Sequence, residues 1–69
     1  MEYATPRQVH TARSIIERYI RAQRLHALPH QAQRLVTTSG NSQTVSVTRM
    51  KQMEKAEIGR LLDDLRGAF

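Results

Sequence analysis

The sequence has no cysteine and no tryptophan, and only 4% of its residues are aromatic. Without cysteine, the chain forms no disulfide bond and offers no thiolate ligand to a metal ion. So few aromatic rings disfavour the binding of single-stranded nucleic acid, because that binding depends on stacking of bases on such rings. The chain also lacks a run of about 18 apolar residues, the length that a membrane-spanning helix needs. We therefore expect a soluble, cytoplasmic protein that has no membrane partner.

Residue patterns typical of catalysis and of metal binding are missing as well. The candidate nucleophiles are the serines and threonines of residues 37–44, and no histidine lies on that segment to activate one of them. Asp63 and Asp64 are adjacent, so on a helix their carboxylates do not form a facing pair. His26 and His30 have a spacing that two metal ligands can use, but Pro29 lies between them and a third ligand is missing. We expect no enzymatic activity, no metal, no cofactor and no small-molecule substrate.

The length of 69 residues allows one small domain. A domain of this size buries only about 60% of the surface of its unfolded chain, which leaves its stability marginal. Association with further copies is a common source of added stability in such small proteins. We therefore expect residues 1–69 to form a single domain and the protein to be a homodimer.

Positive charge is concentrated in the first half of the chain. The net charge is +5, and residues 1–36 contain six arginines and no lysine against two glutamates. Residues 37–69 contain five basic and four acidic residues, so they are nearly balanced. Arginine binds phosphate and carboxylate groups through a planar fork of N–H donors. The first half is therefore predicted to bind an anionic partner.

The spacing of apolar residues predicts a helix over residues 6–26. Thr5, Pro6 and Gln8 are typical of a helix start, because threonine and glutamine three residues apart form a capping box around proline at the first helical position. At about 100° per residue, apolar and basic side chains fall on opposite faces. The apolar face consists of Val9, Ala12, Ile15, Ile16, Tyr19, Ile20 and Ala22, and the cationic face of Arg7, Arg13, Arg18, Arg21 and Arg24, with Glu17 as its acidic residue.

Proline and glycine divide the middle of the chain. Leu28-Pro29 ends or sharply kinks the first helix, because proline disfavours helical geometry in the residue before it. A short second helix is predicted over residues 29–36. Gly40-Asn41 is a turn signal, and residues 44–48 alternate between polar and apolar as strands do. Residues 34–38 and 43–47 either pair as a β-hairpin within 34–48 or belong to a flexible loop, and we favour the hairpin.

A second long amphipathic helix is predicted over residues 49–66. Ser46 or Thr48 caps its start, and Gly67 is placed as its C-terminal cap. Gly59 either allows close approach of another helix or is simply tolerated at an exposed position. The apolar face consists of Met50, Met53, Ile58, Leu61, Leu62 and Leu65. The expected fold is mainly α: two long amphipathic helices, a short middle helix and a hairpin at about 34–47, in a small bundle completed by dimerisation.

The sequence from Thr38 to Val47 resembles the hairpin of AbrB/MazE-type DNA-binding antitoxins and regulators. The resemblance rests on a Ser-Gly-Asn-Ser-Gln turn that leads into an alternating strand. It implies a hairpin exchanged between the subunits of a dimer, with its turn facing DNA. The chain departs from the family pattern, because Thr48-Arg49 replaces the usual proline-basic pair, a second hairpin is missing and a long helix precedes the motif.

Together these features predict a small basic DNA-binding transcriptional regulator that acts as a homodimer. Phosphate contacts would dominate its affinity, and base contacts its specificity. The alternative is a protein-binding inhibitor or adaptor that sets the arginine-rich helix face against an acidic surface of a partner. Tyr19, Met50 and Met53 would join that contact, because arginine, tyrosine and methionine are enriched in protein interfaces. The residues predicted to contact DNA or such a partner are Arg7, Arg13, Arg18, Arg21, Arg24, Asn41, Gln43 and Arg49.

Overall fold

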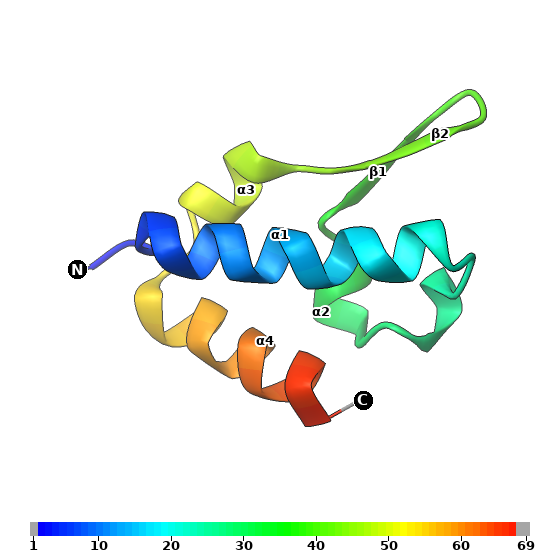
Figure 1. Cartoon of the computed structure of the whole chain (residues 1–69). Coiled ribbons are helices and arrows are strands. Elements are labelled where there is room, and N and C mark those ends of the chain that lie inside the picture. Colours follow the sequence, from blue (N-terminus) through cyan, green and yellow to red (C-terminus); the bar gives the residue numbers. More distant parts are fainter. Residues whose placement is uncertain (1, 68–69) are drawn as a thin grey trace.

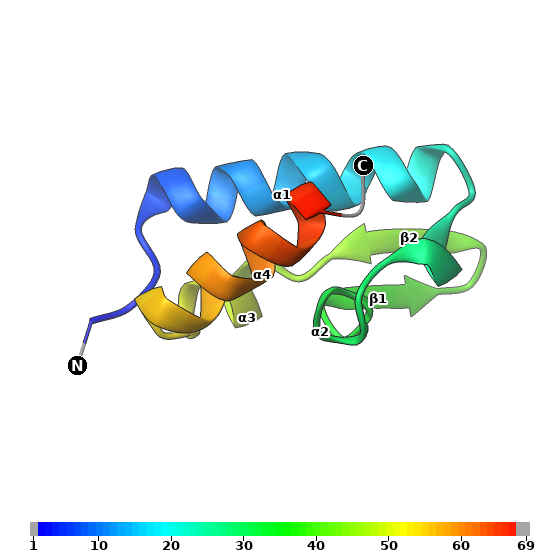
Figure 2. The same ribbon diagram turned by 90° about the horizontal axis from the view of Figure 1, so that it is seen from below.

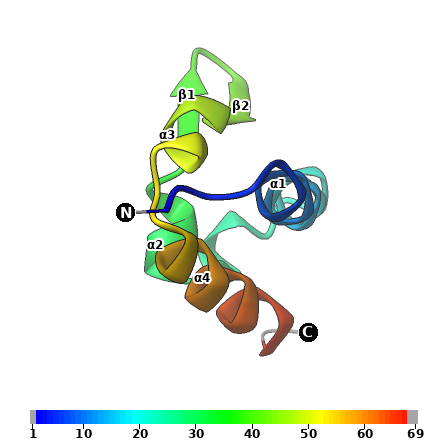
Figure 3. The ribbon, with the colours of Figure 1, turned by 90° about the vertical axis from the view of Figure 1, so that its left-hand side faces the viewer.

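The computed structural model of the protein describes residues 2–67 and is mostly helical, at 62%. The elements are α1 (Pro6–Arg21), the 3-10 turn η1 (Leu25–Ala27), α2 (His30–Gln33), β1 (Val36–Ser39), β2 (Ser42–Val45), α3 (Val47–Lys51) and α4 (Lys55–Gly67) (Figure 1). α1 packs against α4, α3 and β2. Seen along α1, the hairpin and α4 lie on different sides of this helix (Figure 3). The prediction of a mainly α fold with two long helices, a short middle helix and a hairpin is confirmed.

α1 begins where the sequence predicts. The Thr5 hydroxyl accepts a hydrogen bond from the Gln8 N–H at 3.1 Å, and Gln8 Oε1 accepts one from the Thr5 N–H at 3.0 Å. This capping box satisfies two backbone donors that the first turn of a helix leaves without partners. The predicted apolar face is the one that packs: Val9, Ala12, Ile16 and Tyr19 are buried and Ile15 and Ile20 partly buried, whereas Ala22 is exposed.

α1 ends at Arg21, so the prediction that it runs to residue 26 is wrong. The chain leaves the helix through Gln23, whose φ of 56° lies in the left-handed region. The Gln23 N–H donates to the Ile20 carbonyl at 3.1 Å, and the Arg24 N–H donates to the Tyr19 carbonyl at 2.9 Å. These two bonds form a Schellman motif, which satisfies carbonyls in the last turn. Glycine or asparagine usually occupies the left-handed position, so a glutamine there gives no signal in the sequence.

The short helix α2 follows Pro29, which is its N-cap. It ends at Gln33 rather than at the predicted residue 36, and Val36 is already the first residue of β1. Leu28 and Ala32 are buried. The side-chain amide of Gln33 donates to the Leu28 carbonyl at 2.8 Å. The two buried side chains anchor the segment to the core, and the hydrogen bond holds the turn around Pro29 together.

The hairpin is formed by β1 and β2, which pair antiparallel with Val36 opposite Val45. Gly40 and Asn41 form its two-residue loop, and Gly40 has a φ of 60°. A glycine at the first loop position is typical of the type II′ turn, whose twist suits a hairpin. The hairpin is thus confirmed and the loop alternative is wrong, although the strands are shorter than the predicted 34–38 and 43–47. Val47 belongs to α3, not to a strand.

The helix predicted over residues 49–66 is two helices in the structure. The N–H groups of Gln52 and Met53 still donate to α3 carbonyls, but the next backbone groups along the chain bond to the N-terminal segment. The Ala4 N–H donates to the Met53 carbonyl at 2.9 Å, and the Lys55 N–H donates to the Glu2 carbonyl at 2.9 Å. A helix running through residues 52–54 would need these backbone groups for its own bonds. Contact with a distant segment therefore interrupts the predicted helix.

The remaining helix-end predictions are met in part. Ser46 is the N-cap of α3, but its side chain makes no capping hydrogen bond. Gly67 is the last residue of α4 rather than a cap beyond it. A Cβ on Gly59 would lie 4.0 Å from Gln8 Nε2, an ordinary van der Waals contact. Close approach of another helix therefore does not require glycine at this position.

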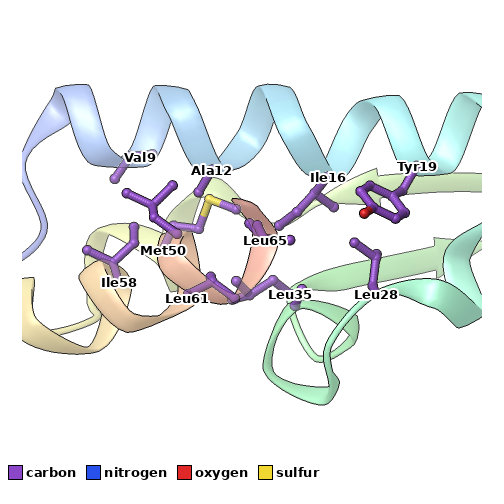
Figure 4. Close-up of a cluster of buried hydrophobic side chains, with 12 residues drawn as sticks. Val9, Ala12, Ile16, Tyr19, Leu28, Leu35, Met50, Ile58, Leu61 and Leu65 are labelled. Atoms are coloured by element: carbon purple, nitrogen blue, oxygen red, sulfur yellow. The ribbon is translucent and has the colours of Figure 1, made fainter. Parts of the chain in front are cut away.

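One hydrophobic core joins all the helices (Figure 4). Val9 and Ile58 lie toward one end of it, and Tyr19 and Leu28 toward the other. Met50 is fully buried and fixes the short helix α3 in this core, so the expectation that Met50 and the buried Tyr19 contact a partner protein is wrong. Within residues 2–67 no polar or charged side chain is buried. The buried residues are Val9, Ala12, Ile16, Tyr19, Leu28, Ala32, Leu35, Met50, Ile58, Leu61, Leu62 and Leu65.

Candidate nucleic-acid interface

The arginine face of α1, which we define as Arg7, Arg13, Arg18 and Arg21, points to solvent. Burial of the opposite face fixes the rotation of the helix, because residues three and four apart share one side. All four arginines are exposed as a result. The cationic face predicted from the sequence is therefore a surface of the folded protein, and Arg24 is also exposed but lies beyond the end of α1.

Glu17 lies within this arginine face and contacts two of its members. Its Oε1 accepts a hydrogen bond from Arg13 Nε at 2.8 Å, and its Oε2 lies 4.0 Å from Arg21 Nη2. The Arg13 and Arg21 side chains remain 53% and 81% exposed. A guanidinium has five N–H donors, so both arginines keep free donors for another anion. No acidic side chain of residues 2–67 forms an ion pair with Arg7 or Arg18.

A groove runs between α1 and β2, which lie side by side (Figure 2). Val45 is partly buried against the core, and this packing sets β2 on α1. The groove brings together three predicted contact residues, Arg13, Arg21 and Gln43, from two separate segments. Its lining consists of Arg13, Glu17, Ile20, Arg21, Gln43, Thr44 and Val45. It combines guanidinium donors with an exposed side-chain amide, a pairing suited to a phosphate beside another hydrogen-bonding group.

Asn41 lies outside this groove. It is exposed at the loop of the hairpin, and the loop projects beyond α1 (Figure 1). Gln43 and Asn41 therefore belong to one exposed ribbon, but only Gln43 borders the arginines.

Arg49 makes a contact that the sequence analysis missed. Its Nη1 donates a hydrogen bond to the Arg34 carbonyl at 2.9 Å, so it links α3 to the residue that follows α2. A basic side chain often binds the free carbonyls at a helix end. The bond joins residues 15 apart in the sequence, so no local pattern predicts it. Arg49 is exposed, yet part of its hydrogen-bonding capacity serves the fold.

Two further basic residues, neither of them predicted as a contact from the sequence, extend the surface along α1. A second depression lies between α1 and α3, and His10 and Lys51 line it together with Arg13. Arg13 thus borders both depressions. Lys51 comes beside α1 only because α3 packs on it, so spacing in the sequence could not reveal this neighbour.

α4 differs from α1 in its charge. It carries three basic residues and three acidic residues, all of them exposed. Positive charge in the folded protein is therefore asymmetric, with its excess on α1 and a balanced surface on α4. The residues concerned are Lys55, Arg60 and Arg66 against Glu57, Asp63 and Asp64.

Within residues 2–67 no group of three histidine, aspartate or glutamate side chains is gathered to hold a metal ion. No helix in the described part of the chain combines the length and apolar character needed to cross a membrane. In comparisons with known proteins, no family model, no curated protein and no solved structure matches this chain.

Proposed function

We propose that the protein is a DNA-binding transcriptional regulator that acts as a homodimer and holds the DNA backbone with the arginine face of α1. The observation that carries this proposal is the exposure of four arginines on one side of a single helix that contains one acidic residue. Phosphate contacts supply most of the electrostatic affinity for DNA. Guanidinium groups suit these contacts because their fork of donors matches the phosphate oxygens.

The hairpin provides the second half of the proposal. The major groove of DNA is wide enough to admit a two-stranded β-ribbon, and glutamine and asparagine there can form paired hydrogen bonds with adenine. Gln43 and Asn41 are exposed on such a ribbon, beside the helix that carries the arginines. We propose that the arginines position the protein on the backbone and that the hairpin enters the adjacent groove.

A titration of labelled duplex DNA tests this function. Fluorescence anisotropy is followed as protein is added, at salt concentrations from about 50 to 200 mM, a range over which phosphate-dominated affinity falls by orders of magnitude. Binding at micromolar or lower concentration, with a steep dependence on salt, would support the proposal. No binding at the lowest salt concentration would contradict it.

One observation favours the alternative, a protein-binding inhibitor or adaptor. Glu17 places a carboxylate between Arg13 and Arg21, and a carboxylate repels phosphate but pairs readily with a basic group on a protein. A partner with a mainly acidic surface and one basic residue would match this arrangement. Replacement of Glu17 separates the two functions, because loss of the carboxylate strengthens binding to DNA and weakens binding to such a partner.

A further inference from the structure

The outer edge of β1 has no neighbouring strand. The sheet has two strands, and β2 lies between β1 and α1 (Figures 2 and 3). The other edge of β1 therefore faces away from α1. Thr37, Thr38 and Ser39 are exposed there, and Val36 is partly buried. An open edge presents unpaired backbone donors and acceptors, which favour the addition of another strand.

The hydrogen-bonding pattern of the hairpin decides which backbone groups this edge offers. In an antiparallel pair, residues that exchange hydrogen bonds with the facing strand alternate with residues that do not. The Ser46 N–H donates to the Leu35 carbonyl at 2.7 Å, which places Leu35 in the bonded set. Two residues further on, Thr37 also directs its backbone groups toward β2. Val36 and Thr38 consequently direct theirs outward, and no hydrogen bond from elsewhere in residues 2–67 reaches them.

β1 is short, but it lacks three other features that keep edge strands of natural proteins apart, which are charged side chains, proline and bulges. Its four residues are uncharged and contain no proline. They pair one to one with β2, so the strand has no bulge. In a chain with a net charge of +5, this uncharged edge is a place where two identical molecules meet without setting like charges opposite each other.

We propose that a second copy of this chain pairs antiparallel with the outer edge of β1, so that two hairpins form one continuous sheet. In the central register, Thr37 faces Thr37 of the second copy. In that register, Val36 lies opposite Thr38 of the second copy, and Thr38 lies opposite Val36 of the second copy. Each outward N–H therefore meets an outward carbonyl. The two threonines at the centre form a close pair of the kind that stabilises sheets. This inference rests on the homodimer of the proposed function and needs no DNA.

Charge placed at Thr37 tests the pairing by its effect on molecular mass in sedimentation equilibrium without DNA. Thr37→Lys and Thr37→Glu each put like charges at the centre of the interface, so we expect each variant to be monomeric where the unmodified protein is a dimer. An equimolar mixture of the two variants should restore a dimer, because opposite charges then face each other. Restoration in the mixture also shows that both variants are folded.

Thr44→Lys is the matched control, because Thr44 is the partner of Thr37 within the hairpin and lies on the inner strand. This variant should dimerise as the unmodified protein does. In the dimer, the amide protons of Val36 and Thr38 should exchange with solvent more slowly than in the Thr37→Lys variant. A monomeric unmodified protein at all concentrations, a Thr37→Lys variant that still dimerises, or a mixture that stays monomeric would each overturn the inference.

The outcome is separable from that of the proposed function. A monomer that binds duplex DNA would contradict the proposed β1 interface and support the arginine face as the phosphate-binding surface. A dimer of the expected kind that binds no DNA would support the interface and contradict the DNA-binding function.

Discussion

The carboxylate of Glu17 accepts a hydrogen bond from the guanidinium of Arg13 at 2.8 Å, in the middle of the arginine face of α1. The same carboxylate lies 4.0 Å from Arg21. Pairs four residues apart on a helix surface stabilise it by about 0.2–0.5 kcal/mol. The more important consequence concerns binding, because this one negative charge reduces the attraction of the face for any polyanion.

Glu17→Gln should therefore strengthen binding to duplex DNA severalfold, since it removes a repelling charge and frees donors of Arg13 and Arg21. Stability should change by less than about 1 kcal/mol, because Glu17 makes two ion pairs, both at the surface. Anisotropy titration and urea denaturation measure the two effects. Asp63→Asn makes the same change of charge on α4 and should affect affinity less. Equal gains in both variants would show that net charge, not the arginine face, governs binding.

Loss of the capping box should weaken the start of α1. Thr5→Ala removes the oxygen that accepts the Gln8 N–H, and loss of such a cap costs about 1 kcal/mol. Thr11→Ala is the control, because its hydroxyl donates to the Arg7 carbonyl within the helix at 2.9 Å and alanine favours helix interiors. Urea denaturation should show destabilisation by the first substitution and none by the second. Equal stability of the two variants would contradict this role of Thr5.

The left-handed backbone at Gln23 predicts a substitution that stabilises the protein. A side chain at this φ costs about 1 kcal/mol, a penalty that glycine avoids although its unfolded state is more flexible. Gln23→Gly should thus raise the free energy of unfolding by about 0.5 kcal/mol. Ala22→Gly is the control, since the φ of Ala22 is −80° and glycine gains nothing there. Thermal unfolding measures the stability of both variants. A loss of stability in Gln23→Gly similar to that in Ala22→Gly would contradict the claim that the left-handed backbone at Gln23 costs stability.

Arg49 should contribute more to stability than to DNA binding. Arg49→Ala removes the hydrogen bond to the Arg34 carbonyl, which we expect to lower the free energy of unfolding by about 1 kcal/mol. Its effect on DNA affinity should be smaller than that of Arg18→Ala, because Arg18 has no ion pair within residues 2–67 and belongs to the arginine face. Denaturation and anisotropy measurements on both variants distinguish the roles. A larger loss of DNA affinity from Arg49→Ala than from Arg18→Ala would contradict this assignment and show that Arg49 contacts DNA.

Patterns local in the sequence predicted the parts of the fold that depend on local contacts. Thr5 and Gln8 predict the start of α1 because the two residues form hydrogen bonds with each other. Gly40 predicts the turn of the hairpin because the positive φ needed there suits glycine. The buried faces of α1 and α4 follow from the helical period alone.

The errors have a common physical cause, which is contact between distant segments or a rare backbone state. The break between α3 and α4 depends on bonds from Glu2 and Ala4 to residues 53–55, and nothing near residue 53 encodes them. The early end of α1 depends on a glutamine in a conformation that usually takes glycine. The arginine face follows from spacing within one helix. The positions of Gln43 and Lys51 beside that face depend on packing between distant segments, so only the fold shows them.

The most direct test of the arginine face compares two charge-matched double variants. Arg18→Ala with Arg21→Ala removes two charges from α1, and Arg60→Ala with Arg66→Ala removes two from α4. Each phosphate contact contributes about −0.9 to the slope of log affinity against log salt concentration. The slope measured by anisotropy with duplex DNA should become less steep by about 1–2 for the α1 variant, with little change for the α4 variant. Equal losses of affinity and slope in the two variants, or no binding by the unmodified protein, would contradict a phosphate-binding role for α1.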